Sequence, residues 1–174
     1  FSSCDYLDVV PDNMPTIEYA FRNKVEAEKY LYTCYSYLPN WVNVANNPGL
    51  NGGEEVWNCP YVLGNTQYYQ MNIGNNISSP NFNYWDGANG GKKLYEALRN
   101  CNIFLENIEL VKDLDTGQRA QWIAEVKFLK AYYHWFLAQL YGPIPLIKEN
   151  ISIEADEKDM RVYREPFDEV VNYI

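Results

Sequence analysis

The side chains best suited to bind a ligand are concentrated between residues 40 and 91. This stretch holds 13 of the 20 asparagines and eight of the ten glycines, with eight aromatic residues interleaved. Flat aromatic rings stack on the C–H faces of sugar rings, and amide or acidic side chains hydrogen-bond to the sugar hydroxyl groups. The candidate ligand-binding residues lie in the middle of the stretch: Trp57, Asn58, Tyr61, Tyr68 and Tyr69.

The same stretch is predicted to be a long, irregular loop, because asparagine and glycine favour turns. A loop of this length in a compact domain is typically functional or disordered, and a disordered segment would not retain eight aromatic residues. We therefore expect an ordered loop with a function. Trp41 and Trp85 flank predicted helices and are expected to pack against them. The alternative for the other aromatic residues is that they only fix the loop in place.

Cys4 is a candidate for lipid attachment. It follows Ser2 and Ser3, and bacterial lipoproteins carry small residues just before the cysteine that becomes the lipidated N-terminus. The sequence thus predicts that residues 1–22 form a lipid anchor and an extended N-terminal segment. The alternative is an ordinary cysteine close to the first residue of the sequence.

No metal or cofactor site is predicted. Cys34, Cys59 and Cys101 lack the close spacing of a zinc or redox motif, and the single His134 cannot complete a usual zinc ligand set. Cys34 and Cys101 fall on apolar helix faces, so we expect both to be small, buried hydrophobic side chains.

Two sets of residues can be considered for catalysis. Glu54, Glu55 and Asp86 are carboxylates of the kind that hydrolyse glycosidic bonds, but nothing in the sequence places them across a cleft. His134 lies beside Trp135 on an aromatic helix face, where a ring satisfied by hydrogen bonds is expected. We therefore predict that the chain is not an enzyme.

Composition narrows the class of protein further. A net charge of −9 argues against nucleic-acid binding, which needs clustered lysine and arginine. A hydrophobic fraction of 47% suffices for a packed core, and no apolar run approaches the roughly 18 residues that span a bilayer.

Hydrophobic periodicity predicts helices over 24–38, 92–111 and 117–141, and a further helix that begins at about Pro166. Asn23 is a suitable N-cap for the first helix, with Glu26 in capping-box position. Asp115 or Thr116 is expected to cap the third helix, and Gly142 followed by Pro143 to end it. Four apolar residues are expected to face inward from the last helix: Phe167, Val170, Val171 and Ile174.

The inward faces of the two central helices are predicted from the same spacing. For the first of them they are Leu94, Leu98, Cys101, Leu105 and Ile108. For the second they are Ala120, Ile123, Ala124, Phe128, Ala131, Tyr132, Trp135, Phe136 and Leu140. Asn102 is expected to hold a neighbouring loop by hydrogen bonds.

These elements predict an all-α fold of tetratricopeptide-like helical hairpins with one long irregular loop, over residues 23–174. The short connection between the central helices requires an antiparallel hairpin. Because the last predicted helix has too few turns to bury its apolar face alone, we expect this chain to be the N-terminal part of a larger fold.

Three stretches resemble the SusD/RagB family of outer-membrane nutrient-uptake lipoproteins. The first is Ser-Cys-Asp-Tyr-Leu-Asp at 3–8, and the second is Leu-Tyr-Glu-Ala-Leu-Arg-Asn-Cys-Asn-Ile-Phe-Leu-Glu-Asn-Ile at 94–108. The third and most specific is Ala-Glu-Val-Lys-Phe-Leu-Lys-Ala-Tyr-Tyr at 124–133, which continues to Leu-Tyr-Gly-Pro-Ile-Pro-Leu at 140–146. Together they span nearly the whole chain in the order found in the family.

The resemblance implies a helical fold with tetratricopeptide-like units, anchored by a lipid on Cys4 to the outer membrane and facing outward. It implies a SusC-like TonB-dependent transporter as partner and a glycan as ligand. Two alternatives remain open: a RagB-like protein that binds peptides, and a tetratricopeptide-like scaffold for protein interactions.

Overall fold

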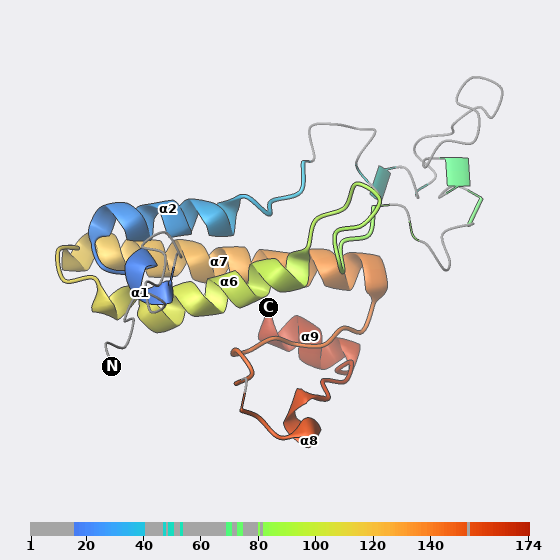
Figure 1. Ribbon diagram of the computed structural model, residues 1–174. Helices are drawn as coiled ribbons and strands as arrows, with labels where there is room; N and C mark the ends of the chain where they lie inside the picture. Colours follow the sequence, from blue (N-terminus) through green and yellow to red (C-terminus); the bar gives the residue numbers. More distant parts are fainter. Residues whose placement is uncertain are drawn as a thin grey trace, which may run out of the picture.

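Helices make up the regular structure of the residues that the structure describes. The computed structural model describes residues 16–40, 47, 49–50, 53, 69–70, 73–74, 80, 82–152 and 154–174. Within these ranges the secondary structure is helical and contains no strand, which confirms the predicted all-α class. Three longer helices lie side by side (Figure 1): α2 (Lys24–Tyr35), α6 (Leu94–Asn107) and α7 (Thr116–Tyr141). The shorter ones are α1 (Ile17–Ala20), η3 (Ile108–Leu110), α8 (Glu157–Met160) and α9 (Phe167–Tyr173).

Helix α2 begins where the sequence predicts. The side chain of Asn23 accepts a hydrogen bond from the Glu26 amide at 3.0 Å, as expected of an N-cap. The helix ends at Tyr35, three residues before the predicted end at residue 38. Pro39 disfavours helical backbone at the residue before it, so the chain leaves the helix ahead of the proline.

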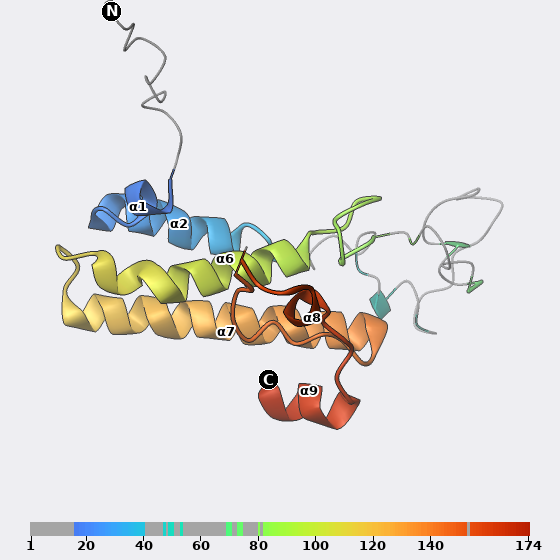
Figure 2. The ribbon, with the colours of Figure 1, turned by 60° about the horizontal axis from the view of Figure 1, so that its bottom comes forward.

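Helices α6 and α7 form the predicted antiparallel hairpin, and α2 packs against both of them (Figures 1 and 2). The side chain of Asp115 accepts from the Gln118 amide at 3.0 Å and caps α7. At the other end of α7, Gly142 adopts a φ of +69° and donates its amide hydrogen to the Ala138 carbonyl at 2.9 Å. Because a side chain at this φ would be strained, glycine is the suitable residue to end the helix.

The core lies between these three helices. The predicted inward face of α6 is confirmed, since Leu94, Leu98, Cys101 and Ile108 are fully buried, although Leu105 is only half-buried. Cys34 of α2 is buried as well, and both cysteines are free thiols, as expected of small core residues. A hydrogen bond with Cys101, together with burial, raises the pKa of the Cys34 thiol.

Hydrogen bonds of tyrosine hydroxyl groups connect α2 and the turn that follows it to the α6–α7 hairpin. Each hydroxyl group finds a hydrogen-bond partner on another element, which a hydroxyl withdrawn from water requires. The four pairs are Tyr30 with Asn100 at 2.9 Å, Tyr35 with Glu125 at 3.0 Å, Tyr37 with Glu96 at 2.8 Å, and Tyr133 with the Cys34 carbonyl at 2.5 Å.

The inward face of α7 differs from the prediction. Of the nine residues expected to face inward, Phe136 alone is fully buried, while the Phe128 side chain is 68% exposed and Trp135 39% exposed. The buried residues are instead Trp122, Val126, Leu129, Tyr133, His134, Phe136, Leu137 and Ala138. The helix is therefore turned so that part of the predicted face lies on the surface.

Helix α9 packs against α7 and lies below the hairpin in Figure 2. Of the four residues predicted to face inward, only Val170 is buried. Phe167, Val171 and Ile174 are each at least 40% exposed, so the prediction for this helix is largely wrong. In the parts of the chain that the structure describes, no helix combines the length and the apolar character needed to cross a membrane.

Candidate functional site

Most of the predicted site residues lie outside the described residues. This holds for the proposed lipid attachment site, Cys4, and for four of the five candidate ligand contacts: Trp57, Asn58, Tyr61 and Tyr68. Tyr69 is described, and it is half-buried. Its carbonyl accepts a hydrogen bond from the Ile73 amide at 3.1 Å, which closes a local turn. The predicted ligand contacts therefore remain a prediction.

The end of the 40–91 segment is anchored on the hairpin. Phe82 and Tyr84 are buried, and the Tyr84 amide donates to the hydroxyl group of Tyr141 at 3.0 Å. The Trp85 ring contacts the rings of Tyr95 and Tyr141, with centroid distances of 4.6 and 5.6 Å. The prediction that Trp85 packs against helices is confirmed, and Trp41 lies outside the described residues.

Of the acidic residues considered for catalysis, Asp86 is described. Its carboxylate accepts the Ala88 amide at 2.9 Å in the turn that follows Trp85, and its side chain is exposed. This contact gives Asp86 a local structural role, because short acidic side chains commonly close turns in this way. Glu54 and Glu55 lie outside the described residues.

His134 is a structural residue. It is fully buried on α7, and its Nδ1 lies 2.8 Å from the Lys130 carbonyl, while its Nε2 accepts the Ile147 amide at 3.1 Å. Since a backbone amide can only donate, the ring proton must be on Nδ1. Burial lowers the pKa of His134 from 6.5 to about 4, so the ring is neutral near pH 7. This confirms the expectation that His134 is a helix residue whose ring is hydrogen-bonded within the fold.

Asn102 and Asn150 hold the segment after α7 against α6. The Asn102 amide nitrogen lies 3.5 Å from both the Ile147 carbonyl and the Asn150 side-chain oxygen. Asn150 in turn donates to the Arg99 carbonyl at 3.4 Å. The predicted loop-holding role of Asn102 is thus confirmed, although the contacts are long.

These contacts create a hollow of about 200 Å³ between α6 and residues 147–151, lined by Tyr95, Arg99, Ile147, Glu149, Asn150 and Ile151. An aromatic ring, an amide, a guanidinium group and a carboxylate beside apolar side chains form a set that suits a sugar ring. Tyr95 also has a buried hydroxyl group without a hydrogen-bond partner among the described residues. Sequence reasoning did not find this hollow, because the lining residues become neighbours only when the 147–151 segment folds back on α6.

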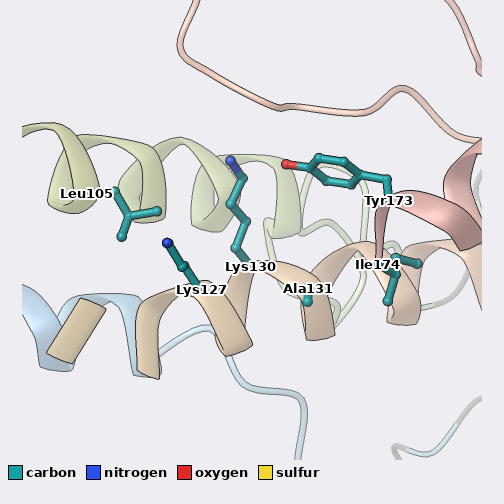
Figure 3. A pocket seen from close by; sticks show the side chains of 6 residues that line it. All are labelled: Leu105, Lys127, Lys130, Ala131, Tyr173 and Ile174. Carbon is teal, nitrogen blue, oxygen red and sulfur yellow. The ribbon is translucent and has the colours of Figure 1, made fainter. Parts of the chain in front are cut away.

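A second hollow, of about 300 Å³, lies where α9 meets the hairpin (Figure 3). Lys127 and Lys130 extend from α7, and Tyr173 points toward them from α9, with Leu105 of α6 opposite. The Lys148 ammonium group lies 5.6 Å from the centre of the Tyr173 ring. Two cations thus line this hollow, and a third lies near its tyrosine, in a chain with a net charge of −9.

Metal ligands do not gather in the described ranges. There, no group of three or more His, Cys, Asp or Glu side chains is arranged to hold an ion.

The sequence as a whole matches a known family. Residues 5–174 match the SusD-like family described as "Starch-binding associating with outer membrane". A curated relative, the SusD-like protein P25 of Formosa agariphila, is 24% identical over 164 residues. That alignment covers 88% of this chain and 30% of the relative's length.

Because the family match extends over nearly the whole chain, the chain belongs to the SusD-like family. This confirms the resemblance proposed from the sequence motifs. The family is associated with the outer membrane and with starch binding by its description, and the chain spans about a third of the curated relative's length.

Proposed function

We propose that this chain is part of a cell-surface protein that captures glycans for uptake and does not cleave them. The observation that carries this proposal is the match of residues 5–174 to a family described as starch-binding and outer-membrane-associated. The hollow between α6 and residues 147–151 supports it, because its volume of about 200 Å³ and its mixed lining suit a single sugar ring.

The principal ligand contacts in this proposal are Trp57, Asn58, Tyr61, Tyr68 and Tyr69. The end of their segment is fixed to α6 and α7 through Tyr84 and Trp85, so the loop leaves from a rigid base. Binding residues are often carried on loops that a rigid scaffold positions. Peptide binding in the manner of RagB is the alternative for the same loop.

Replacement of Trp57 by alanine tests the proposed ligand contacts. We expect the Kd for the cognate glycan to rise about thirtyfold or more, since a stacking aromatic at the centre of a site contributes about 2 kcal/mol or more. The melting temperature should change little, because the proposal makes Trp57 a ligand contact and not a core residue. Both quantities are measured on the same purified variant, with maltoheptaose as the first probe and other defined oligosaccharides after it.

Trp85→Ala is the matched control, because the Trp85 ring packs on Tyr95 and Tyr141. It should lower the melting temperature clearly. If Trp57→Ala destabilises the protein in the same way, or leaves the affinity for a bound glycan unchanged, Trp57 is a packing residue and is not a ligand contact.

The proposal extends to the partner and the anchor. A lipid on Cys4 would hold the protein on the outer face of the outer membrane, where it would deliver captured glycan to a SusC-like TonB-dependent transporter. The family description supports the outer-membrane association, and the position of Cys4 after Ser2 and Ser3 supports the lipid.

A protein-interaction scaffold is a second candidate function, favoured by the outer face of α7. Phe128, Tyr132 and Trp135 follow one another along this face, with ring centroids 6.4 and 5.5 Å apart. Phe128 and Trp135 are exposed and Tyr132 is half-buried. Exposed aromatic side chains are common at protein interfaces. Glycan binding is preferred because the family description names it.

A further inference from the structure

The hollow at the junction of α6, α7 and α9 is lined by two lysines together with apolar and aromatic side chains (Figure 3). Lys127 is exposed, and Lys130, one helical turn further along α7, is half-buried. Residues three apart on a helix lie on the same face, so both ammonium groups reach the same hollow. The hydroxyl group of Tyr173 points toward them from α9.

Neither lysine forms a salt bridge with a carboxylate in the described part of the chain. The Lys130 ammonium group donates one hydrogen bond, to the Lys148 carbonyl at 2.5 Å, and retains two N–H groups. Burial lowers the pKa of Lys130, although the nearby carboxylates of Glu106 and Glu149 act in the opposite direction. A partly dehydrated cation that forms no salt bridge within the described residues is stabilised when an anion binds directly beside it.

The remaining lining of the hollow suits the face of a ring. Leu105, Ala131 and Ile174 contribute apolar side chains, and Tyr173 contributes a half-buried aromatic ring. The volume of about 300 Å³ leaves room for one sugar unit with a substituent. Two ammonium groups beside apolar and aromatic side chains match a sugar ring that carries a carboxylate.

We propose that this hollow is a subsite for an acidic sugar unit, whose carboxylate is bound by Lys127 and Lys130 while its ring lies against Tyr173 and Leu105. The inference rests on the proposed glycan-binding function and specifies a ligand class for it. It also adds a site apart from the 40–91 segment. The carboxylate of a peptide offers the same charge without the sugar ring, so a peptide serves as the competing probe.

The test compares three probes on the full chain by calorimetric titration: tetragalacturonic acid, the same tetrasaccharide with its carboxylates reduced to alcohols, and tetra-aspartate. We expect the acidic tetrasaccharide to bind about tenfold or more tightly than the reduced one, because charge-assisted hydrogen bonds would be lost on reduction. Lys127→Gln should weaken this preference, and Lys127→Gln with Lys130→Gln should abolish it. Lys112→Gln, an exposed lysine outside the hollow, should change nothing.

Two outcomes overturn the subsite. One is equal affinity for the acidic and the reduced tetrasaccharides, and the other is a preference that survives both lysine substitutions. Tetra-aspartate binding as tightly as the acidic tetrasaccharide overturns the assignment to sugar.

Because Lys127 is exposed, the Lys127→Gln variant should fold normally. If the double variant is unstable, the single variant alone still tests the subsite. If neither this tetrasaccharide pair nor any neutral oligosaccharide binds, the proposed function fails as well; binding of neutral glycans alone refutes only the subsite.

Discussion

At the scale of single residues, His134, the only histidine in the sequence, shows how burial and hydrogen bonding remove a side chain from acid–base chemistry. His134 receives one hydrogen bond from Ile147 and donates one to Lys130, so both ring nitrogens are occupied within the fold. A base with no free nitrogen and a pKa of about 4 has no part to play in proton transfer near neutral pH. The structure thus supports the reading of His134 as a core residue.

The same burial predicts a pH dependence of stability. The unfolded chain has a histidine pKa near 6.5 and the folded chain one of about 4, so protons bind preferentially to the unfolded state. The contribution of His134 to stability is complete above about pH 6.5 and is lost as the pH falls toward 4. The shift corresponds to roughly 3 kcal/mol.

Denaturant unfolding of the wild type and His134→Gln between pH 7.5 and 4 measures this effect. Carboxylates also titrate in this range, but they affect both proteins alike, so the difference between the two reports His134. The stability advantage of the wild type should shrink as the pH falls. A difference that stays constant across the range would contradict the assignment of a low pKa to a buried, neutral ring.

At the scale of elements, α7 shows which features can be read from sequence. Its ends follow from Asp115 and Gly142, whose capping contacts are local and visible in the sequence. The inward face of α7 cannot be predicted from the sequence, because apolar and aromatic residues lie on more than one side of the helix. The hydrophobic periodicity is compatible with more than one rotation of the helix about its axis, and only packing against α2 and α6 selects between them.

Two phenylalanines of α7 test the rotation of this helix. Phe136 is fully buried and its ring packs on Tyr84, with centroids 4.7 Å apart, whereas Phe128 is 68% exposed. Phe136→Ala should cost about 3–5 kcal/mol of unfolding free energy through the cavity that it leaves. Phe128→Ala should cost less than about 0.5 kcal/mol. Chemical denaturation of both variants provides the comparison, and equal losses would place Phe128 in the core after all.

The candidate sites show a second limit of sequence reasoning. The aromatic residues of the 40–91 segment can be found in the sequence because they cluster along the chain. Lys130 and Tyr173, in contrast, lie on different helices, and α9 brings the tyrosine to the lysine through the burial of Val170 against the hairpin. Sites assembled from separate elements leave no local pattern from which they can be predicted.

At the scale of the whole molecule, the chain corresponds to about a third of the length of its curated relative. The predicted tetratricopeptide-like stack requires neighbouring hairpins to cover the outer faces of its members. The exposed Phe128 and Trp135 of α7, and Phe167 of α9, are the apolar side chains that such neighbours would cover.

The proposed anchor is tested in the native host. Cys4→Ala should move the protein from the outer-membrane fraction to the soluble fraction, because a protein without the acyl chains loses its membrane affinity. Immunoblots of fractionated cells measure this, with Ser3→Ala as a control that keeps a small residue before the cysteine. Retention of the Cys4→Ala protein in the membrane would contradict lipid attachment at this residue.

The central claim, that the protein captures glycans without cleaving them, is tested most directly by incubating the purified protein with defined polysaccharides. Two quantities are measured in each mixture: the polysaccharide bound to the protein and the reducing ends released into solution. The account predicts that at least one polysaccharide, starch among those tested, is retained on the protein while reducing ends stay at the level of the protein-free sample. Release of reducing ends would indicate a glycosidase, and failure to retain any glycan would leave peptide binding or a protein-interaction scaffold; either result contradicts the account.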